Sequence, residues 1–131
     1  PNNWDRIEMH ILKYYVKRCI GLPEDTLSIK NGRFRVEGID EPLGNIKSQQ
    51  KIGQTLPEEF PSGVYRCFPY DSIIGWNIQN FGPLYIPKTG DRLPMNLKNY
   101  QLYHKLISWE QKAKLEYKDS TVFLNDKPIK D

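Results

Sequence analysis

The sequence of 131 residues predicts a mainly β protein with one helix. Alanine, the strongest helix former, occurs once, at Ala113, whereas tyrosine, phenylalanine and tryptophan together number 16. Glycine and proline together number 19, which favours many turns over a helix bundle. The length suits one domain, or one domain with a small appended lobe.

The first half of the chain carries the strand predictions. Residues 12–20 alternate in a way that fits a strand, interrupted by charge. The next segment, TLSIK-NG-RFRVEG over 26–38, has alternating apolar residues on both sides of Asn31-Gly32, the strongest short signal for a type I′ hairpin. Residues 40–63 are polar and Gly/Pro-spaced, and are expected to form a mobile connection or a lobe boundary.

The second half is expected to contain the helix and another hairpin. Residues 64–87 hold three β-like runs, VYRCF, SIIGWNI and PLYIP, followed by a turn at 87–91. Residues 96–114 have apolar side chains at spacings of three and four after Asn96, a good N-cap. Residues 115–128 then repeat the pattern of strand, polar turn and strand.

Composition excludes several classes of function. A net charge of +3 is too small to argue for nucleic acid binding. The longest uncharged run, 72–87, is too short and too broken by Gly and Pro to span a membrane. Cys19 and Cys67 form no C-x-x-C pair, so we expect no zinc; two separate buried thiols are favoured over a disulfide. No metal cluster or phosphate loop is evident, and no cofactor is expected.

One segment invites a chemical interpretation: YVKRCIGLPED over 15–25, with Lys17 between apolar neighbours. Lysine is depleted in strands, and an edge-strand gatekeeper or a solvent-reaching lysine is the plain interpretation. The segment also resembles the lysine-bearing box of the type I signal peptidases, Y-[VI]-K-R-x-[IV]-G-L-P-G-D. The resemblance is tight over about 15–37, and only Glu24 departs from the box, where the family has Gly.

The resemblance implies a membrane-bound serine endopeptidase that removes signal peptides from exported preproteins. Lys17 would be the general base, with Arg18, Gly21, Leu22, Pro23 and Asp25 ordering the site. A lysine acts as a base only when neutral, and burial among apolar groups lowers a lysine pKa. The predicted strand, with Tyr15 and Cys19 on the same face as Lys17, would provide that burial. Gly90-Asp91 resembles a further P-x-x-G-D turn of the family, although a plain surface turn is the favoured interpretation.

Two parts of the family pattern are missing from the chain. Residues 1–16 contain no serine, and no later serine lies in an S-x-M-x-P box. The final G-D-N-R box is absent too, and the chain begins with Pro1. We therefore expect a piece of a longer protein, inactive alone, with the nucleophile outside this chain.

The resemblance also implies an organisation and a location. Residues 1–40 would belong to a catalytic β core and 41–131 to a β-rich insertion lobe. The parent would be anchored in the bacterial cytoplasmic membrane, with this portion on the extracytoplasmic side. Its partners would be preprotein signal peptides and, through the anchor, membrane lipid, with no nucleic acid.

Two rival interpretations stay open. The first is a non-catalytic β-rich module that binds peptide or glycan and carries the lysine box by coincidence. The second, a self-cleaving Ser/Lys domain of the repressor type, is disfavoured because it would lack the G-L-P-x-D turn. The sequence leaves the substrate repertoire, the role of the insertion and the oligomeric state open.

Overall fold

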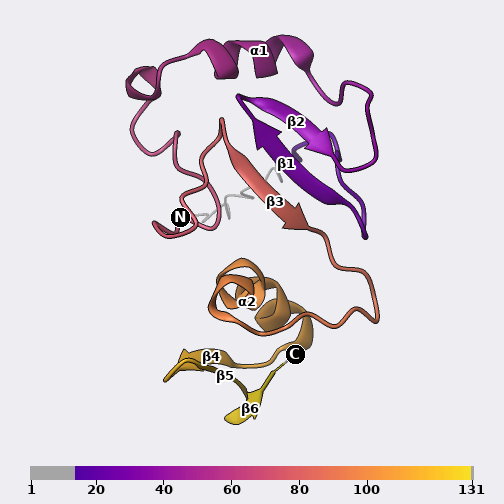
Figure 1. Cartoon of the computed structure of the whole chain (residues 1–131), viewed down its shortest axis with the longest axis vertical. Helices are drawn as coiled ribbons and strands as arrows, with labels where there is room; N and C mark the ends of the chain where they lie inside the picture. Colours follow the sequence, from indigo (N-terminus) through magenta and orange to yellow (C-terminus); the bar gives the residue numbers. More distant parts are fainter. Residues whose placement is uncertain (1–13, 131) are drawn as a thin grey trace, which may run out of the picture.

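The computed structural model describes residues 14–130, which form two small antiparallel sheets and two α-helices (Figure 1). The prediction of a β-rich fold is confirmed, although the described residues hold a second helix that the sequence did not predict. The elements, in chain order, are β1 Thr26–Lys30, β2 Arg33–Val36, α1 Ile46–Gln54, a 3₁₀ turn Pro57–Glu59, β3 Phe81–Tyr85, α2 Leu97–Gln111, β4 Leu115–Lys118, β5 Thr121–Leu124 and β6 Lys127–Ile129.

The first sheet has the strand order β2-β1-β3. Its hairpin is the predicted one: Leu27 pairs with Val36, and the turn residues Asn31 and Gly32 have φ of 49° and 77°. Both turn residues therefore adopt the left-handed conformation that a type I′ turn requires. β3 pairs with the other side of β1, so a strand from beyond residue 40 completes this sheet.

The expectation of a mobile connection over 40–63 is wrong, because α1 occupies its centre. Asn45 caps the helix by accepting the backbone N–H of Ser48 at 3.1 Å. The buried Gln49 accepts the backbone N–H of Phe34 at 3.0 Å and donates to the carbonyl of Leu43. Gln49 thus occupies the free edge of β2 and ties the helix to the sheet.

A second buried glutamine holds the end of α1. The Gln79 amide donates to the carbonyls of Ile52 and Thr55, each at 2.7 Å. These carbonyls lie at the C-terminal end of the helix, where carbonyl groups lack partners within the helix. Long-range polar contacts, rather than an apolar stripe, therefore fix α1.

Residues 64–80 are irregular, so the predicted strands VYRCF and SIIGWNI are wrong, apart from one bridge between Arg66 and Asn77. Asp71 explains part of this, because its carboxylate accepts the backbone N–H groups of Ile73 and Ile74 at 2.8 and 2.9 Å. Those bonds form a local turn in place of a ladder. Of the three runs, only PLYIP contributes to a strand, β3.

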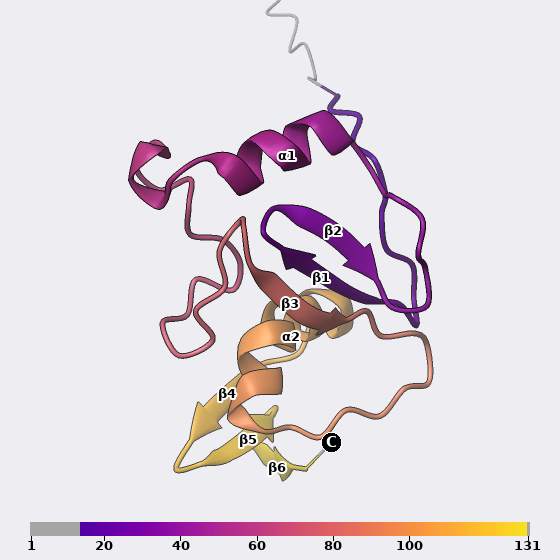
Figure 2. The same ribbon diagram turned by 45° about the horizontal axis from the view of Figure 1, so that its top comes forward.

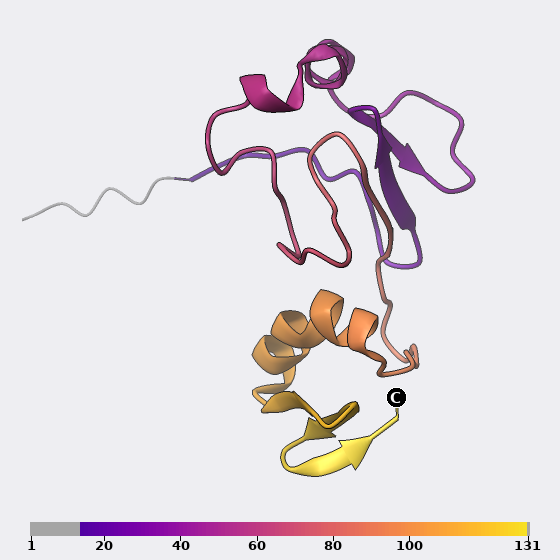
Figure 3. The same ribbon diagram turned by 60° about the vertical axis from the view of Figure 1, so that its left-hand side comes forward.

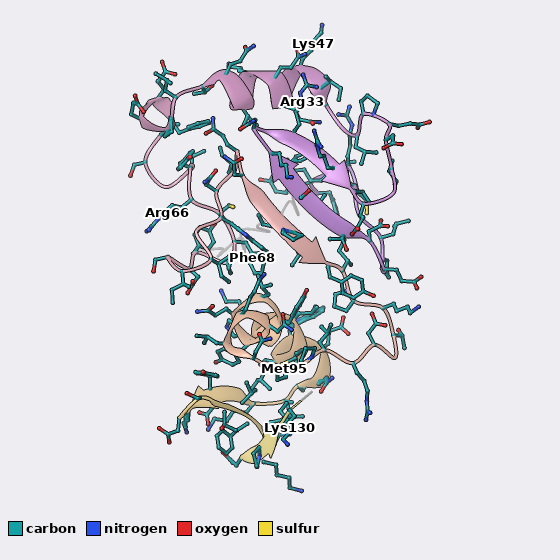
Figure 4. The ribbon with its side chains drawn as sticks, in the orientation of Figure 1. Arg33, Lys47, Arg66, Phe68, Met95 and Lys130 are labelled. Carbon is teal, nitrogen blue, oxygen red and sulfur yellow. The ribbon has the colours of Figure 1, made fainter. Side chains whose placement is uncertain are left out.

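The C-terminal part follows the prediction closely. Asn96 caps α2 by accepting the N–H of Asn99 at 2.9 Å, and the helix ends where Lys112 takes a left-handed conformation. The hairpin of β4 and β5 forms as expected, and β6 adds a third strand. Figure 4 shows Met95 and Lys130 close together there; the Met95 N–H donates to the Lys130 carbonyl at 2.6 Å.

The helix α2 lies between the two sheets and joins them (Figure 2). The phenol of Tyr103 donates to the carbonyl of Tyr85, the last residue of β3, at 2.7 Å. On the other side, the ring of Tyr100 packs against that of Tyr117 in β4, with centroids 5.7 Å apart. The core is small, and its buried apolar residues are Val36, Leu102, Tyr103, Leu115 and Val122.

Candidate functional site

The lysine box, residues 15–25, begins as an exposed, irregular segment. This segment leads into a tight turn and then into β1. Tyr15 is 78% exposed, and Lys17, Arg18 and Cys19 are also exposed. The predicted strand over 12–20 is wrong for its described residues 14–20, while residues 12 and 13 lie outside the described part. The expected burial of Lys17 by Tyr15 and Cys19 is wrong as well.

The physical reason is the lack of a partner strand. Tyr15, Val16 and Ile20 favour a strand, but a strand also needs a neighbour for its backbone N–H and C=O groups. No described strand pairs with residues 14–20, and Lys17 forms no hydrogen bond or ion pair with any described residue. The described residues therefore supply no apolar surroundings for the Lys17 side chain.

The second half of the box is well ordered. Leu22, Pro23, Glu24 and Asp25 form a turn closed by the N–H of Asp25, which donates to the Leu22 carbonyl at 3.0 Å. The Asp25 carboxylate accepts the N–H of Leu22 at 2.7 Å and closes the turn a second time. Proline in second position and a positive φ in third position are typical of a type II turn.

Glu24 occupies that third position with a φ of 80°. This is the left-handed region, which glycine enters freely and other residues enter at a cost. The departure from the glycine of the signal peptidase box therefore leaves the turn conformation intact. Its carboxylate binds the Lys88 ammonium, and both side chains are largely exposed.

The turn is clamped to the residue that follows β3. The N–H of Glu24 donates to the Ile86 carbonyl, and the N–H of Ile86 donates to the Asp25 carbonyl, both at 2.8 Å. A Cβ added to Gly21 would lie 2.5 Å from the side chain of Ile86. A larger residue at position 21 would therefore have to displace that side chain.

A second turn, Lys88 to Asp91, repeats the geometry of the first. The N–H of Asp91 donates to the Lys88 carbonyl at 3.2 Å, and the Asp91 carboxylate accepts the Lys88 N–H at 3.0 Å. Gly90, with a φ of 91°, occupies the third position, as Glu24 does in the first turn. The two turns are joined by the ion pair of Lys88 and Glu24.

Sequence reasoning weighed the second turn as a plain surface turn and missed its link to the box. The available signal was the shared aspartate, which ends both L-P-E-D and K-T-G-D. The Asp91 carboxylate also accepts a hydrogen bond from the Tyr85 phenol at 2.6 Å. This bond raises the pKa of Tyr85 to about 12 and lowers the pKa of Asp91.

The remaining chemical groups are few. Cys19 and Cys67 are both free thiols, as expected, but the expected burial is wrong for Cys19, which is exposed. Partial burial raises the pKa of Cys67. Within residues 14–130, no group of histidine, cysteine and carboxylate side chains is arranged to hold a metal ion. None of the helices in that range is long and apolar enough to cross a membrane.

Comparison with known proteins gives one partial similarity. A stretch of 52 residues is 40% identical to a signal peptidase I of Bacillus amyloliquefaciens, covering 37% of this chain and 28% of the relative. No family model matches the chain, and no solved structure matches it significantly. The similarity supports a relationship to the signal peptidases, a family of peptidases, over a short stretch.

Proposed function

We propose that this chain is part of a type I signal peptidase, a membrane-bound serine endopeptidase that removes signal peptides from exported preproteins. The observation that carries the proposal is the conformation of the box, because its residues Pro23, Glu24 and Asp25 each occupy a defined position in the turn. Pro23 and Glu24 occupy the second and third positions of a type II turn, and Asp25 closes it. The partial similarity to a signal peptidase I agrees with this assignment.

In the proposed mechanism Lys17 is the general base. Its neutral Nζ takes the proton from a serine hydroxyl supplied outside this chain, and the serine Oγ attacks the carbonyl carbon of the scissile peptide bond. The lysine then returns the proton to the leaving amine. A second cycle of proton transfer, with water as the attacking group, hydrolyses the acyl-enzyme.

The turn contributes by fixing where the lysine segment starts. Gly21 packs against Ile86, and Glu24 and Asp25 bond to the backbone of Ile86, so the segment leaves the sheet at a defined point. We propose that residues 14–20 become a strand when another part of the parent protein pairs with them. That strand would bury Lys17, which supplies the neutral amine, and Arg18 would help to order the site.

The proposal includes the organisation expected from the resemblance. Residues 1–40 belong to the catalytic core and 41–131 to an insertion lobe, with β3 reaching back to complete the sheet of β1 and β2. The anchor, the nucleophilic serine and the final G-D-N-R box lie elsewhere in the parent. The portion described here faces the extracytoplasmic side of the bacterial membrane.

The experiment is preprotein processing by the parent protein with Lys17→Ala. Loss of cleavage is expected, whereas Lys47→Ala, on the outer face of α1 (Figure 4), leaves cleavage unchanged. Full processing by Lys17→Ala would refute the assignment. The sequence of the parent gene gives a second check, since an S-x-M-x-P box after a membrane span should precede this segment.

A second candidate function has one observation in its favour. A groove of about 560 Å³ lies between β1, β2 and the loop over 37–43, with Ser28, Arg35 and Gln49 in its lining. Such a groove suits a non-catalytic module that binds peptide or glycan. A parent gene without the serine box and the G-D-N-R box would favour this module.

A further inference from the structure

α2 and its C-cap carry three lysines at intervals of seven residues: Lys98 and Lys105 in the helix, and Lys112 at the C-cap. Seven residues are close to two helical turns, so Lys98 and Lys105 project from the same side of the helix, and Lys112 follows at its C-terminal end. All three are exposed, and none forms an ion pair with a described residue. We call this surface, with the exposed Trp109 between its last two lysines, the α2 lysine face.

No carboxylate on the helix neutralises this face. Glu110 is the single acidic residue of α2, and it lies about 100° or more around the helix axis from Lys98, Lys105 and Trp109. The Asp71 carboxylate accepts hydrogen bonds from Ile73, Ile74 and the Gln101 amide, and it forms no ion pair with Lys98. No described carboxylate is therefore paired with any of the three lysines.

Apolar side chains lie along the same face. Trp109 is 78% exposed, at a distance of four residues from Lys105 and three from Lys112. At the other end, Ile73 is 81% exposed and lines a hollow of about 390 Å³ with Leu97 and Lys98. Figure 3 shows the loop before β3, the segment that carries Ile73, next to α2.

We propose that the α2 lysine face, extended by Ile73 and Leu97, is a contact surface for a lipid bilayer that contains anionic lipids. Lysines flanking an exposed tryptophan and aliphatic side chains are typical of surfaces that rest in the headgroup region, where the charges meet phosphate and the apolar groups reach the acyl boundary. A second copy of the chain is disfavoured, because equivalent lysines would face one another. Nucleic acid is disfavoured by the small net charge of +3.

The test is cosedimentation of the 131-residue chain with vesicles, which needs no peptidase activity and so stands apart from the proposed function. We expect binding to phosphatidylcholine vesicles that contain phosphatidylglycerol, weaker binding at high salt, and little binding to phosphatidylcholine alone. The triple variant Lys98→Gln/Lys105→Gln/Lys112→Gln should bind on the order of 100-fold more weakly.

A matched control carries the same loss of charge elsewhere: Lys47→Gln/Lys51→Gln/Lys127→Gln, on α1 and β6. This control should lose much less affinity than the α2 variant. Trp109→Ser should also weaken binding, whereas Leu56→Ser, which removes a 55% exposed apolar group near α1, should not. Circular dichroism establishes that each variant is folded.

Three outcomes would overturn the proposal. The first is that the unmodified chain fails to bind the anionic vesicles. The second is equal loss of affinity in the two triple variants, which would make binding a matter of net charge alone. The third is tight binding to a single-stranded oligonucleotide probe, lost in the α2 variant, without binding to vesicles.

Discussion

The phenol of Tyr85 donates a 2.6 Å hydrogen bond to the Asp91 carboxylate, which also accepts the Lys88 N–H at 3.0 Å. One carboxylate therefore joins the end of β3 to the turn that follows it. Lys88 extends the link to Glu24, so that the turn of the lysine box and the turn after β3 form one connected unit.

The Tyr85–Asp91 hydrogen bond predicts a specific alkaline titration. The pKa of Tyr85 is raised to about 12, so its contribution to stability is complete below pH of about 10 and is lost as pH rises through about 12. Asp91→Asn should lower the pH at which one tyrosine ionises, as measured by absorbance at about 295 nm. Asp119→Asn, in the β4–β5 turn, is the control; an unchanged titration in Asp91→Asn would contradict the assignment.

The same bond also predicts a loss of stability at acidic pH. The pKa of Asp91 is lowered, chiefly by the hydrogen bond from Tyr85. The contribution of Asp91 to stability is therefore present at pH values above the ordinary pKa of an aspartate, and it is lost as pH falls through the lowered pKa. Urea unfolding at a series of acidic pH values should therefore show a weaker pH dependence in Tyr85→Phe than in the unmodified chain. Equal dependence in both proteins would argue against the bond.

Glu24 predicts a gain in stability on substitution by glycine. At a φ of 80°, a residue with a side chain lowers the free energy of unfolding by about 1 kcal/mol, and glycine avoids this cost. Glu24→Gln is the matched comparison, because it also removes the ion pair with Lys88 but keeps the backbone cost. Glu24→Gly should be about 1 kcal/mol more stable than Glu24→Gln in urea unfolding, and a less stable glycine variant would contradict the turn geometry.

The hydrogen bonds of Gln49 predict a large loss of stability when its side chain is removed. Gln49→Ala leaves the Phe34 N–H and the Leu43 carbonyl without their partner, at a cost of about 1–3 kcal/mol. The adjacent, exposed Gln50→Ala should change the free energy of unfolding by less than about 0.5 kcal/mol. Similar values for the two variants would show that Gln49 does not hold α1 against β2.

Tyr103 tests the contact between α2 and the first sheet. Tyr103→Phe removes the bond to the Tyr85 carbonyl and should cost about 1 kcal/mol. Tyr100→Phe removes a phenol that bonds to no described residue, and should be nearly neutral. If thermal unfolding is the same for both variants, the helix is not held to β3 by this bond.

The accuracy of the sequence predictions depended on whether the determining contacts were local. Asn31-Gly32 fixed the first hairpin and Asn96 the start of α2, because a turn and a helix cap are set by neighbouring residues. The helix α1 could not be predicted in this way. Its stability depends on Gln49 and Gln79, whose partners lie 15 and 27 residues away or in other elements.

The candidate site shows the same difference between local and long-range contacts. The turn of the box was predictable from Pro23 and Asp25, which act on residues within the turn itself. The environment of Lys17 was not, since it requires a partner strand that the described residues do not supply. The link of Glu24 to Lys88 joins residues 64 apart, and only the shared aspartate of the two turns hinted at it.

The central claim is that Lys17 is the general base of a signal peptidase, and preprotein processing by the parent protein tests it most directly. The account predicts that Lys17→Ala abolishes cleavage, while Lys47→Ala cleaves at the rate of the unmodified enzyme. Cleavage by Lys17→Ala at the unmodified rate would contradict the account.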